Sequence, residues 1–347
     1  MSPQFLPITE TFRRFLALVP ALLLAASLLA VATAAPALAA VEKAIDGITY
    51  TVQPGHDAEA AVTGYDASFG TVVVIPPTVT IDGAEYPVTD IGYAAFSQKG
   101  LTSVTLPDGL VGIGSSAFFG NALTSVTIPD SVVDVGVFAF YEGQLTSVTL
   151  ANSLVTIGEG AFAINRLVSV VVPPSVTTVG LGAFHTNPEM SRVQFTGPAP
   201  TTITAAGVSF PSLGNAAGLT VFFPSEYLAQ SSQPGYTTPE WFGYEAHPVY
   251  TVTFDARGGE AIEPVIVSRS EPVDVPAVPV REGFTFTGWY TTPELETAFE
   301  FQLPATENLT LYAGWQTNTV PVEPVTTDLG SLITGSLGLL GLAGSDQ

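Results

Sequence analysis

The stretch Leu101-Thr-Ser-Val-Thr-Leu106-Pro107 starts again 22 residues later as Leu123-Thr-Ser-Val-Thr-Ile128-Pro129. It returns at the same interval as Leu145-Thr-Ser-Val-Thr-Leu150 and as Leu167-Val-Ser-Val-Val-Val172-Pro173. An Ala-Phe pair keeps the same interval, with its aromatic residue at Phe96, Phe118, Phe140, Phe162 and Phe184. A glycine that always follows Ile or Val does so too, at Gly92, Gly114, Gly136, Gly158 and Gly180. A fixed period of this length indicates a solenoid, in which each coil buries its apolar face against its neighbours.

Within one coil, alternation predicts a short strand. Val104 and Leu106 are two residues apart and share the inward face, whereas Thr102, Ser103 and Thr105 are left for the turn and the outer face. Proline ends the strand, and a second apolar pair, such as Leu110 and Ile113, closes the coil. The repeated glycine marks a place where a side chain does not fit. We therefore expect a mainly β fold with the geometry of a leucine-rich repeat, about five coils long.

These units resemble the BspA-like leucine-rich repeat family, whose pattern reads L-T-S-V-x-[IL]-P-x-S-[VL]-x-x-[IV]-G-x-x-A-F. The resemblance covers about residues 71–195 and implies a bacterial surface protein that engages ligands on host or neighbouring cells. We expect residues 40–195 to form the repeats with an N-terminal cap. Residues 196–248 lose the period and are expected to be an irregular C-terminal cap, because an end coil has no neighbour to cover it.

Residues 249–316 change to ordinary strand alternation, at Tyr250, Val252 and Phe254 and again from Leu309 to Trp315. The Val252-Thr-Phe-Asp255 opening, Gly258-Gly259, Gly288-Trp-Tyr290 and Leu311-Tyr-Ala-Gly-Trp315 resemble the Listeria–Bacteroides repeat, also called the internalin B-repeat. That family implies a small β-grasp-like domain of cell-envelope proteins, which serves as a spacer or weak binder. The expected fold class is thus a leucine-rich repeat solenoid followed by this small domain.

Both ends of the chain have a distinct composition. Residues 1–39 carry Arg13 and Arg14, a long apolar run and a small-x-small pattern at Ala37-Leu38-Ala39, as a signal peptide does. Residues 317–347 form a Pro/Thr-rich and then Gly/Leu/Ser-rich stretch, expected to be a flexible tail. We therefore expect a secreted protein of the cell surface or envelope. We expect no stable membrane insertion once the signal peptide is cleaved.

Charge and cysteine content exclude several classes of function. The chain of 347 residues has 9 Lys and Arg against 31 Asp and Glu, so that its net charge is −22. Such a surface repels phosphate backbones, which argues against nucleic-acid partners. It contains no cysteine, which removes disulfides, thiolate metal sites and cysteine nucleophiles and fits a bacterial exported protein.

No catalytic, cofactor-binding or metal-binding residues are expected. The three histidines, His56, His185 and His247, lie in separate segments, and none belongs to a metal-ligand pattern. The sequence has no nucleophile elbow, phosphate-binding glycine loop or calcium loop. Hydrolysis by a carboxylate pair stays open, because sequence alone does not exclude it, although nothing points to it.

The candidate ligand contacts lie in the loop after each Ala-Phe pair, where the coils differ from one another: Phe119, Tyr141, Asn165 and Arg166. A constant frame with varying loops is typical of recognition surfaces, although neutral drift explains the same pattern. The Thr and Ser columns form a second candidate, for which strand propensity and hydrogen bonding between coils are the simpler explanation.

The stacked strands of the coils are the rungs of a ladder, and five rungs that each expose three residues give a face of about 240 Å². This area is well below the roughly 800 Å² per partner of a standard protein interface. The ladder alone therefore suits an extended glycan or peptide, and a protein ligand needs the loops or the second domain as well. The expected function is an adhesin-like protein that binds an extracellular protein or glycan. The alternative is a structural or spacer protein of the envelope, with a cell-wall polymer as its partner.

Overall fold

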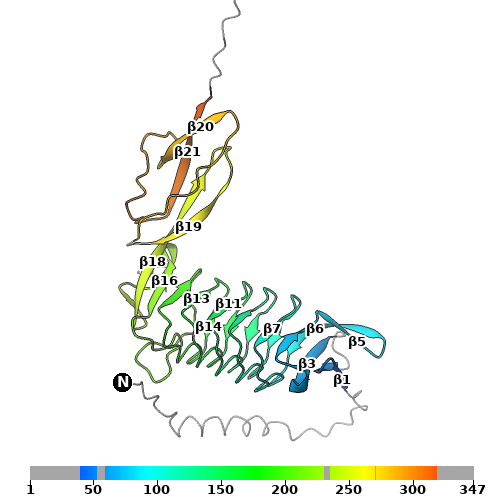
Figure 1. The fold of residues 1–347 in the computed structure, drawn as a ribbon. Coiled ribbons are helices and arrows are strands. Elements are labelled where there is room, and N and C mark those ends of the chain that lie inside the picture. Colours follow the sequence, from blue (N-terminus) through cyan, green and yellow to red (C-terminus); the bar gives the residue numbers. More distant parts are fainter. Residues whose placement is uncertain (1–39, 53–58, 230–234, 270, 319–347) are drawn as a thin grey trace, which may run out of the picture.

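The structure is a computed structural model that describes residues 40–52, 59–229, 235–269 and 271–318. The predicted signal peptide and all but two residues of the predicted tail lie outside the described residues. Figure 1 shows a row of stacked coils with a second module rising from the C-terminal end. The described chain is nearly all β, since its helical elements are two short 3-10 turns, η1 (Ala67–Phe69) and η2 (Ser225–Tyr227).

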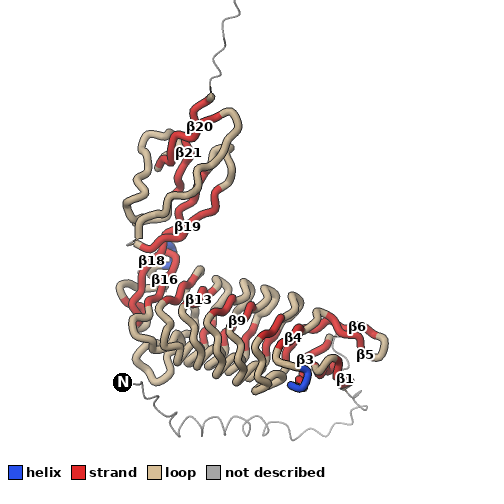
Figure 2. Tube along the Cα trace, viewed as in Figure 1, coloured by secondary structure: helices blue, strands red, loops and turns tan. Residues whose placement is uncertain are grey.

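The solenoid consists of two stacks of short strands, joined by loops that repeat from coil to coil (Figure 2). The longer strands form one stack, which comprises β4 (Val72–Val74), β7 (Ser103–Thr105), β9 (Ser125–Thr127), β11 (Ser147–Thr149), β13 (Ser169–Val172), β15 (Arg192–Phe195) and β16 (Thr220–Pro224). Within this stack, β4 pairs in parallel with β7, β9 with β11, β13 with β15, and β15 with β16. Two-residue strands form most of the other stack, which runs in parallel through β6 (Ala84–Ile91), β8 (Gly112–Ile113), β10 (Asp134–Val135), β12 (Thr156–Ile157) and β14 (Thr178–Val179).

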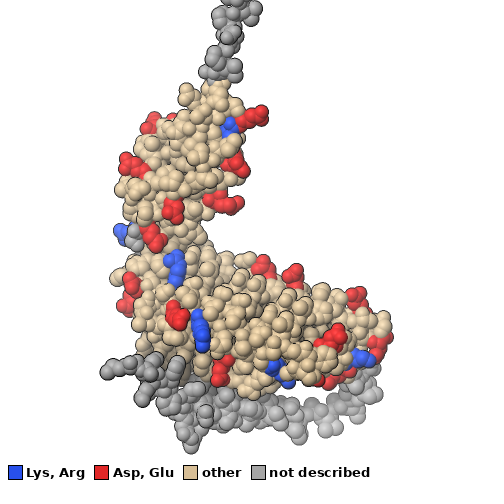
Figure 3. Space-filling view, viewed as in Figure 1, with Lys and Arg blue, Asp and Glu red and all other residues tan. Residues whose placement is uncertain are grey.

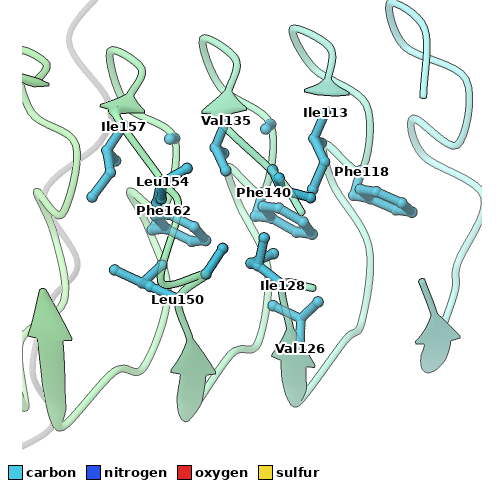
Figure 4. Packing of buried hydrophobic residues seen from close by; sticks show 14 of the residues in the cluster. Ile113, Phe118, Val126, Ile128, Val135, Phe140, Leu150, Leu154, Ile157 and Phe162 are labelled. Atoms are coloured by element: carbon cyan, nitrogen blue, oxygen red, sulfur yellow. The ribbon is translucent and has the colours of Figure 1, made fainter. Parts of the chain in front are cut away.

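The Ala-Phe column forms the centre of the core. Consecutive rings of Phe96, Phe118, Phe140, Phe162 and Phe184 stack with centroids 5.0 to 5.5 Å apart. In Figure 4 the labelled phenylalanines lie in a row between the two strand stacks. Full burial of an apolar side chain of this size contributes roughly 1.5–3 kcal/mol, so the repeated phenylalanine is a main source of solenoid stability.

The glycine column shows why the coils can approach so closely. A Cβ atom on Gly136 would lie 2.6 Å from the amide nitrogen of Ser115, and one on Gly158 would lie 2.6 Å from the carbonyl carbon of Gly136. Both distances are shorter than real Cβ contacts, so a side chain here would force adjacent coils apart. The prediction that a side chain does not fit at this column is confirmed.

The N-terminal end is closed by antiparallel strands. β1 (Val41–Ile45), β2 (Ile48–Val52) and β3 (Ala60–Tyr65) form an antiparallel meander, after which β3 pairs in parallel with β6. β5 (Thr78–Ile81) makes a hairpin with β6. Together these strands cover the first coil on the side where no further repeat precedes it.

The ladder continues into the segment expected to be an irregular cap. β15 pairs with β16, and β16 pairs with β18 (Tyr244–Asp255), in both cases in parallel. The aligned residues Val193, Val221 and Ala246 are 28 and 25 residues apart, instead of 22. Because the loops before these strands are longer, the 22-residue period does not reveal them. The described part of the stack from β4 to β18 has eight strands, whereas the sequence predicts about five coils.

The second module shares a strand with the solenoid. The single strand β18 pairs with β16 through residues 245–249 and with β21 (Leu309–Thr317) through residues 252–255. β19 (Ile262–Ser268) and β20 (Phe284–Tyr290) complete the order β19-β18-β21-β20, and β17 (Glu240–Trp241) pairs beside the joint. The boundary expected between residues 248 and 249 thus falls inside one continuous strand, which holds the two modules together.

Candidate functional site

The outward side chains of β4, β7, β9, β11, β13, β15, β16 and β18 form one surface, which we name the ladder face. Two columns run along it in register. The first contains Val72, Ser103, Ser125, Ser147, Ser169, Arg192, Thr220 and Glu245, and the second contains Val74, Thr105, Thr127, Thr149, Val171, Gln194, Phe222 and His247. The ladder face is therefore apolar at its N-terminal end, rich in hydroxyl groups in the middle, and mixed at its C-terminal end.

A groove of about 700 Å³ lies over the middle of the ladder face. It is lined by the hydroxyl-bearing rungs of β9, β11 and β13 and by the turns that follow them, including Asp108, Thr127, Asp130, Ser147, Thr149, Asn152, Ser169 and Val171. Figure 3 shows a surface dominated by uncharged residues, with few Lys and Arg side chains. A groove of this kind offers hydrogen bonds to a ligand, and the charged residues of its lining, Asp108 and Asp130, are both acidic.

The two threonine columns behave differently. At the entrance of the strands, the Thr102 and Thr146 hydroxyls donate to the carbonyl oxygens of Thr71 and Thr124 in the preceding coils, at 3.2 and 3.1 Å. At the ends of the same strands, the exposed hydroxyls of Thr105, Thr127 and Thr149 have no hydrogen-bond partner within the described part of the chain. Bonding between coils therefore explains only Thr102 and Thr146 of the entrance column, and the hydroxyls at the strand ends face solvent with their hydrogen-bonding capacity unused.

The C-terminal end of the ladder face carries a cluster of larger side chains. The Arg192 guanidinium carbon lies 3.8 Å from the centroid of the Phe222 ring, and Arg192 Nη2 donates to Gln194 Oε1 at 3.1 Å. On the next rung, the His247 ring lies 6.1 Å from Phe222, and His247 Nε2 is 2.9 Å from Glu245 Oε1. Sequence reasoning missed this cluster, because it occurs after the repeat period is lost.

The turn after each strand is fixed by its own polar contacts. Asp130 accepts hydrogen bonds from the backbone amide of Asn152 at 2.9 Å and from its Nδ2 at 3.2 Å. These bonds favour the charged carboxylate and hold the pKa of Asp130 below its usual range. A general acid requires the opposite shift, so this groove carboxylate is poorly suited to acid catalysis.

The predicted contacts Phe119 and Tyr141 lie together at the loop edge of the coils. Their rings stack with centroids 5.4 Å apart, and Phe138 meets Tyr141 edge to face at 5.1 Å. Phe119 is half-buried, but Tyr141 is only 5% exposed. Burial raises the pKa of the Tyr141 hydroxyl, and the neighbouring Glu142 carboxylate adds to the shift. The pair forms a small apolar cluster that closes the coil edge.

The structure gives the predicted contact Asn165 a structural role. Its side chain is 5% exposed, its Oδ1 accepts from the Leu145 amide at 2.9 Å, and its Nδ2 donates to the Phe140 and Phe162 carbonyls at 2.9 and 3.1 Å. Asn121, two coils before Asn165, and Asn187, one coil after it, make the equivalent contacts in their own coils. The recurrence of Asn at one position in three of the four loops is the signal that identifies this role.

Arg166 is exposed at the loop edge. The structure therefore brings Phe119 and Tyr141 together, separates Arg166 as an exposed neighbour and places Asn165 inside the coil. The Thr and Ser columns, which are the second candidate from the sequence, lie on the ladder face.

The titratable groups outside the ladder face form no recognisable centre. Burial raises the pKa of Glu159 and lowers that of His185, whose Nδ1 lies 2.6 Å from the Thr186 hydroxyl. Within the described residues, no group of three or more His, Asp or Glu side chains is arranged to hold a metal ion. In the same part of the chain, no helix combines the length and apolar character needed to cross a membrane.

A parallel β-solenoid with a polar ladder face, joined through one strand to a small β module, defines the class of this protein. Comparison with protein families places a BspA type leucine rich repeat region, in six copies, at residues 89–205. It places a Listeria-Bacteroides repeat domain at residues 250–314. The chain therefore combines these two repeat types, and both resemblances seen in the sequence are confirmed.

Individual relatives match short parts of the chain. A membrane protein of Evansella cellulosilytica is 39% identical over 76 residues, which are 22% of this chain and 11% of the relative. Internalin H of Listeria monocytogenes is 36% identical over 88 residues, which are 24% of this chain and 16% of the relative. The chain thus spans less than a fifth of the length of either relative.

Among solved structures, a leucine-rich repeat protein of T. pallidum is 25% identical, with 56% of this chain and 91% of that chain covered and a TM-score of 0.39. A leucine-rich repeat protein of Bacteroides capillosus is 29% identical, with 44% and 97% covered and a TM-score of 0.28.

Proposed function

We propose that this chain is a secreted, non-enzymatic protein of the bacterial cell surface, which binds an extracellular protein or glycan along its ladder face. The observation that carries the proposal is the groove over β9, β11 and β13, together with the unused hydroxyls of Thr127 and Thr149 on its floor. Rigid rungs present these groups at a regular spacing, so a ligand meets them without paying to order a loop.

The shape of the ladder face favours a narrow ligand. Eight rungs spaced by ~4.8 Å, each about 10 Å wide, give a strip of roughly 400 Å². This is about half of the ~800 Å² that a standard protein partner covers. An extended polymer fits such a strip, whereas a globular protein ligand also has to contact the loop edge near Phe119 and Arg166 or the second module.

The alternative function is that of a structural or spacer protein of the cell envelope. The observation that favours it is the joint between the modules, where β18 runs through both sheets and Asn308 Oδ1 accepts from the Thr251 amide at 2.9 Å. A rigid joint keeps the solenoid at a fixed distance from whatever holds the second module. In that case the chain binds envelope polymers and ignores host ligands.

A binding screen separates these functions. The purified chain is tested against extracellular-matrix proteins, glycans and isolated cell wall. Each saturable hit is measured again with Thr105, Thr127 and Thr149 all changed to Val, which removes three hydroxyls and preserves the side-chain shape. A matched control changes Thr156 and Thr178, which are paired on β12 and β14 of the opposite stack, to Val.

The proposal predicts that the ladder variant loses affinity and the control does not. A third variant, Phe119→Ala with Arg166→Ala, tests the loop edge predicted from the sequence. If every hit is insensitive to the ladder variant, the ladder face is not the binding surface. If only cell wall binds, with no effect of any variant, the spacer function is correct.

A further inference from the structure

The cluster at the C-terminal end of the ladder face has the chemistry to recognise a carboxylate. Arg192 carries five N–H donors, of which Nη2 is bonded to Gln194 Oε1. No ion pair joins Arg192 to an acidic residue in the described part of the chain. Arg192 is half-buried, and its charge is therefore left for a ligand in a chain that has 31 acidic and 9 basic residues.

Arg192 is also held in place before any ligand arrives. The Phe222 ring supports one face of the guanidinium at 3.8 Å, and Gln194 fixes its direction from the same strand. A stacked cation of this kind has already lost most of its side-chain freedom. The fork geometry of arginine matches the two oxygens of a carboxylate, so the remaining N–H groups are oriented for a bidentate contact.

The cluster continues the groove. Arg192 is in register with Ser169 and Gln194 with Val171, and both of these partners line the groove. From β9 to β15 the ladder advances three rungs, or about 14 Å. A ligand lying in the groove therefore reaches Arg192 with one end.

The spacing of the rungs indicates which polymer fits. Rungs repeat every ~4.8 Å, whereas an extended peptide advances ~3.3 Å per residue, so its residues do not match the rungs one for one. A chain of β-linked pyranose sugars advances by nearly one rung per sugar, and each ring brings several hydroxyls to the unused hydroxyls of Thr127 and Thr149. The acidic side chains of Asp108 and Asp130 at the groove disfavour a polymer that is negatively charged along its whole length.

We propose that the groove and the Arg192–Gln194–Phe222 cluster bind an uncharged β-linked oligosaccharide that ends in a carboxylated sugar, with its neutral sugars on β9, β11 and β13 and its carboxylate on Arg192. This proposal rests on the function proposed above and specifies the ligand of the same surface. His247 and Glu245 pair with each other on the rung beyond and close the end of the site.

The test uses three probes and the full chain. The probes are a di-N-acetyllactosamine tetrasaccharide, the same glycan with a terminal sialic acid, and the methyl ester of that sialylated glycan. Calorimetric titration should show that the sialylated glycan binds at least ~10-fold more tightly than the other two, as a charge-assisted bidentate contact implies. Arg192→Gln should remove this difference and leave the affinity for the neutral glycan unchanged.

Two further variants keep the result interpretable. Arg192→Lys retains the charge without the fork and should recover only part of the difference, while Arg257→Gln, which changes an exposed arginine of the second module, should change nothing. Circular dichroism and thermal unfolding check that each variant is folded. Equal affinity for all three probes, or an Arg192→Gln variant that keeps the preference, overturns the carboxylate assignment. Failure to bind any of the three glycans overturns the glycan proposal, whereas a protein ligand lost in the Thr→Val ladder variant leaves the proposed function standing.

Discussion

Changing Asn165 to Ala should destabilise the solenoid strongly, although sequence reasoning places this residue in a ligand-binding loop. The side chain links three consecutive segments, because it accepts from the Leu145 amide and donates to the carbonyls of Phe140, Phe162 and Ala163. Alanine leaves at least the Leu145 amide and the Phe140 carbonyl without their partner inside the core.

The size of the effect follows from those orphaned groups. A buried donor or acceptor that loses its partner costs about 1–3 kcal/mol, so two such groups give a loss of about 2–6 kcal/mol. The neighbouring Arg166→Ala is the matched control, because an exposed side chain of this kind contributes within about ±0.5 kcal/mol. Asn165→Asp keeps the acceptor but points a carboxylate oxygen at the Phe140 carbonyl, so at neutral pH it should be at least as harmful.

Urea unfolding followed by circular dichroism measures these differences as shifts of the midpoint at constant slope. The structural role of Asn165 predicts a large shift for Asn165→Ala and none for Arg166→Ala. A loss below about 1 kcal/mol for Asn165→Ala, or an equal loss for both variants, would refute the reasoning.

Three further outcomes are expected. Phe140→Ala should cost about 3–5 kcal/mol in urea unfolding, because it opens a cavity between Phe118 and Phe162, whereas exposed Val111→Ala should cost little; equal losses would contradict the stacked core. Burial raises the pKa of Glu159, so its contribution to stability is present below the unfolded pKa and is lost as pH rises through the folded pKa. Glu159→Gln should therefore raise the melting temperature at about pH 7 but not at about pH 3, and a gain that is independent of pH would exclude this cause. The Thr251 amide donates a hydrogen bond to Asn308 Oδ1, so Asn308→Ala should speed hydrogen exchange of this amide. The modules should stay together, because β18 joins them. Unchanged exchange would show that the bond does not form in solution.

The repeat itself could be predicted because each coil obeys the same steric rule. Phe140 must stack on Phe118 and Phe162, and Gly136 must leave room for the backbone of the preceding coil, so both residues recur at the period. The pair Leu110 and Ile113 is buried, as expected for residues that close the coil. The type of fold is thus present in the spacing of a few apolar residues and glycines.

The extent of the solenoid was not predictable from the period. β16 and β18 follow longer loops, and strand pairing does not depend on loop length, so the stack continues where the interval is lost. For a related reason, the sequence did not show which of the predicted contacts are buried. Variation between loops drew attention to Asn165 and Tyr141, but their burial and contacts in three dimensions depend on neighbouring coils.

The distinction between the two threonine columns also required the structure. Thr102 and Thr105 look equivalent in the sequence, yet only the first is close enough to a carbonyl of the preceding coil to bond to it. The Arg192 cluster combines the last strand of the predicted repeats with β16 and β18, which lie beyond them, so no spacing in the sequence connects Arg192 with Phe222.

The central claim, that the ladder face is the binding surface, is tested most directly by mapping the footprint of a bound ligand. Methyl groups of threonine are labelled with carbon-13 in the full chain, and their NMR signals are followed as a ligand from the binding screen is added. Ligand binding on the ladder face predicts that the signals of Thr105, Thr127 and Thr149 shift together with one dissociation constant, while those of Thr156 and Thr178 on the opposite stack stay in place. Shifts confined to residues outside the ladder face, with saturable binding and no change at these three threonines, would contradict it.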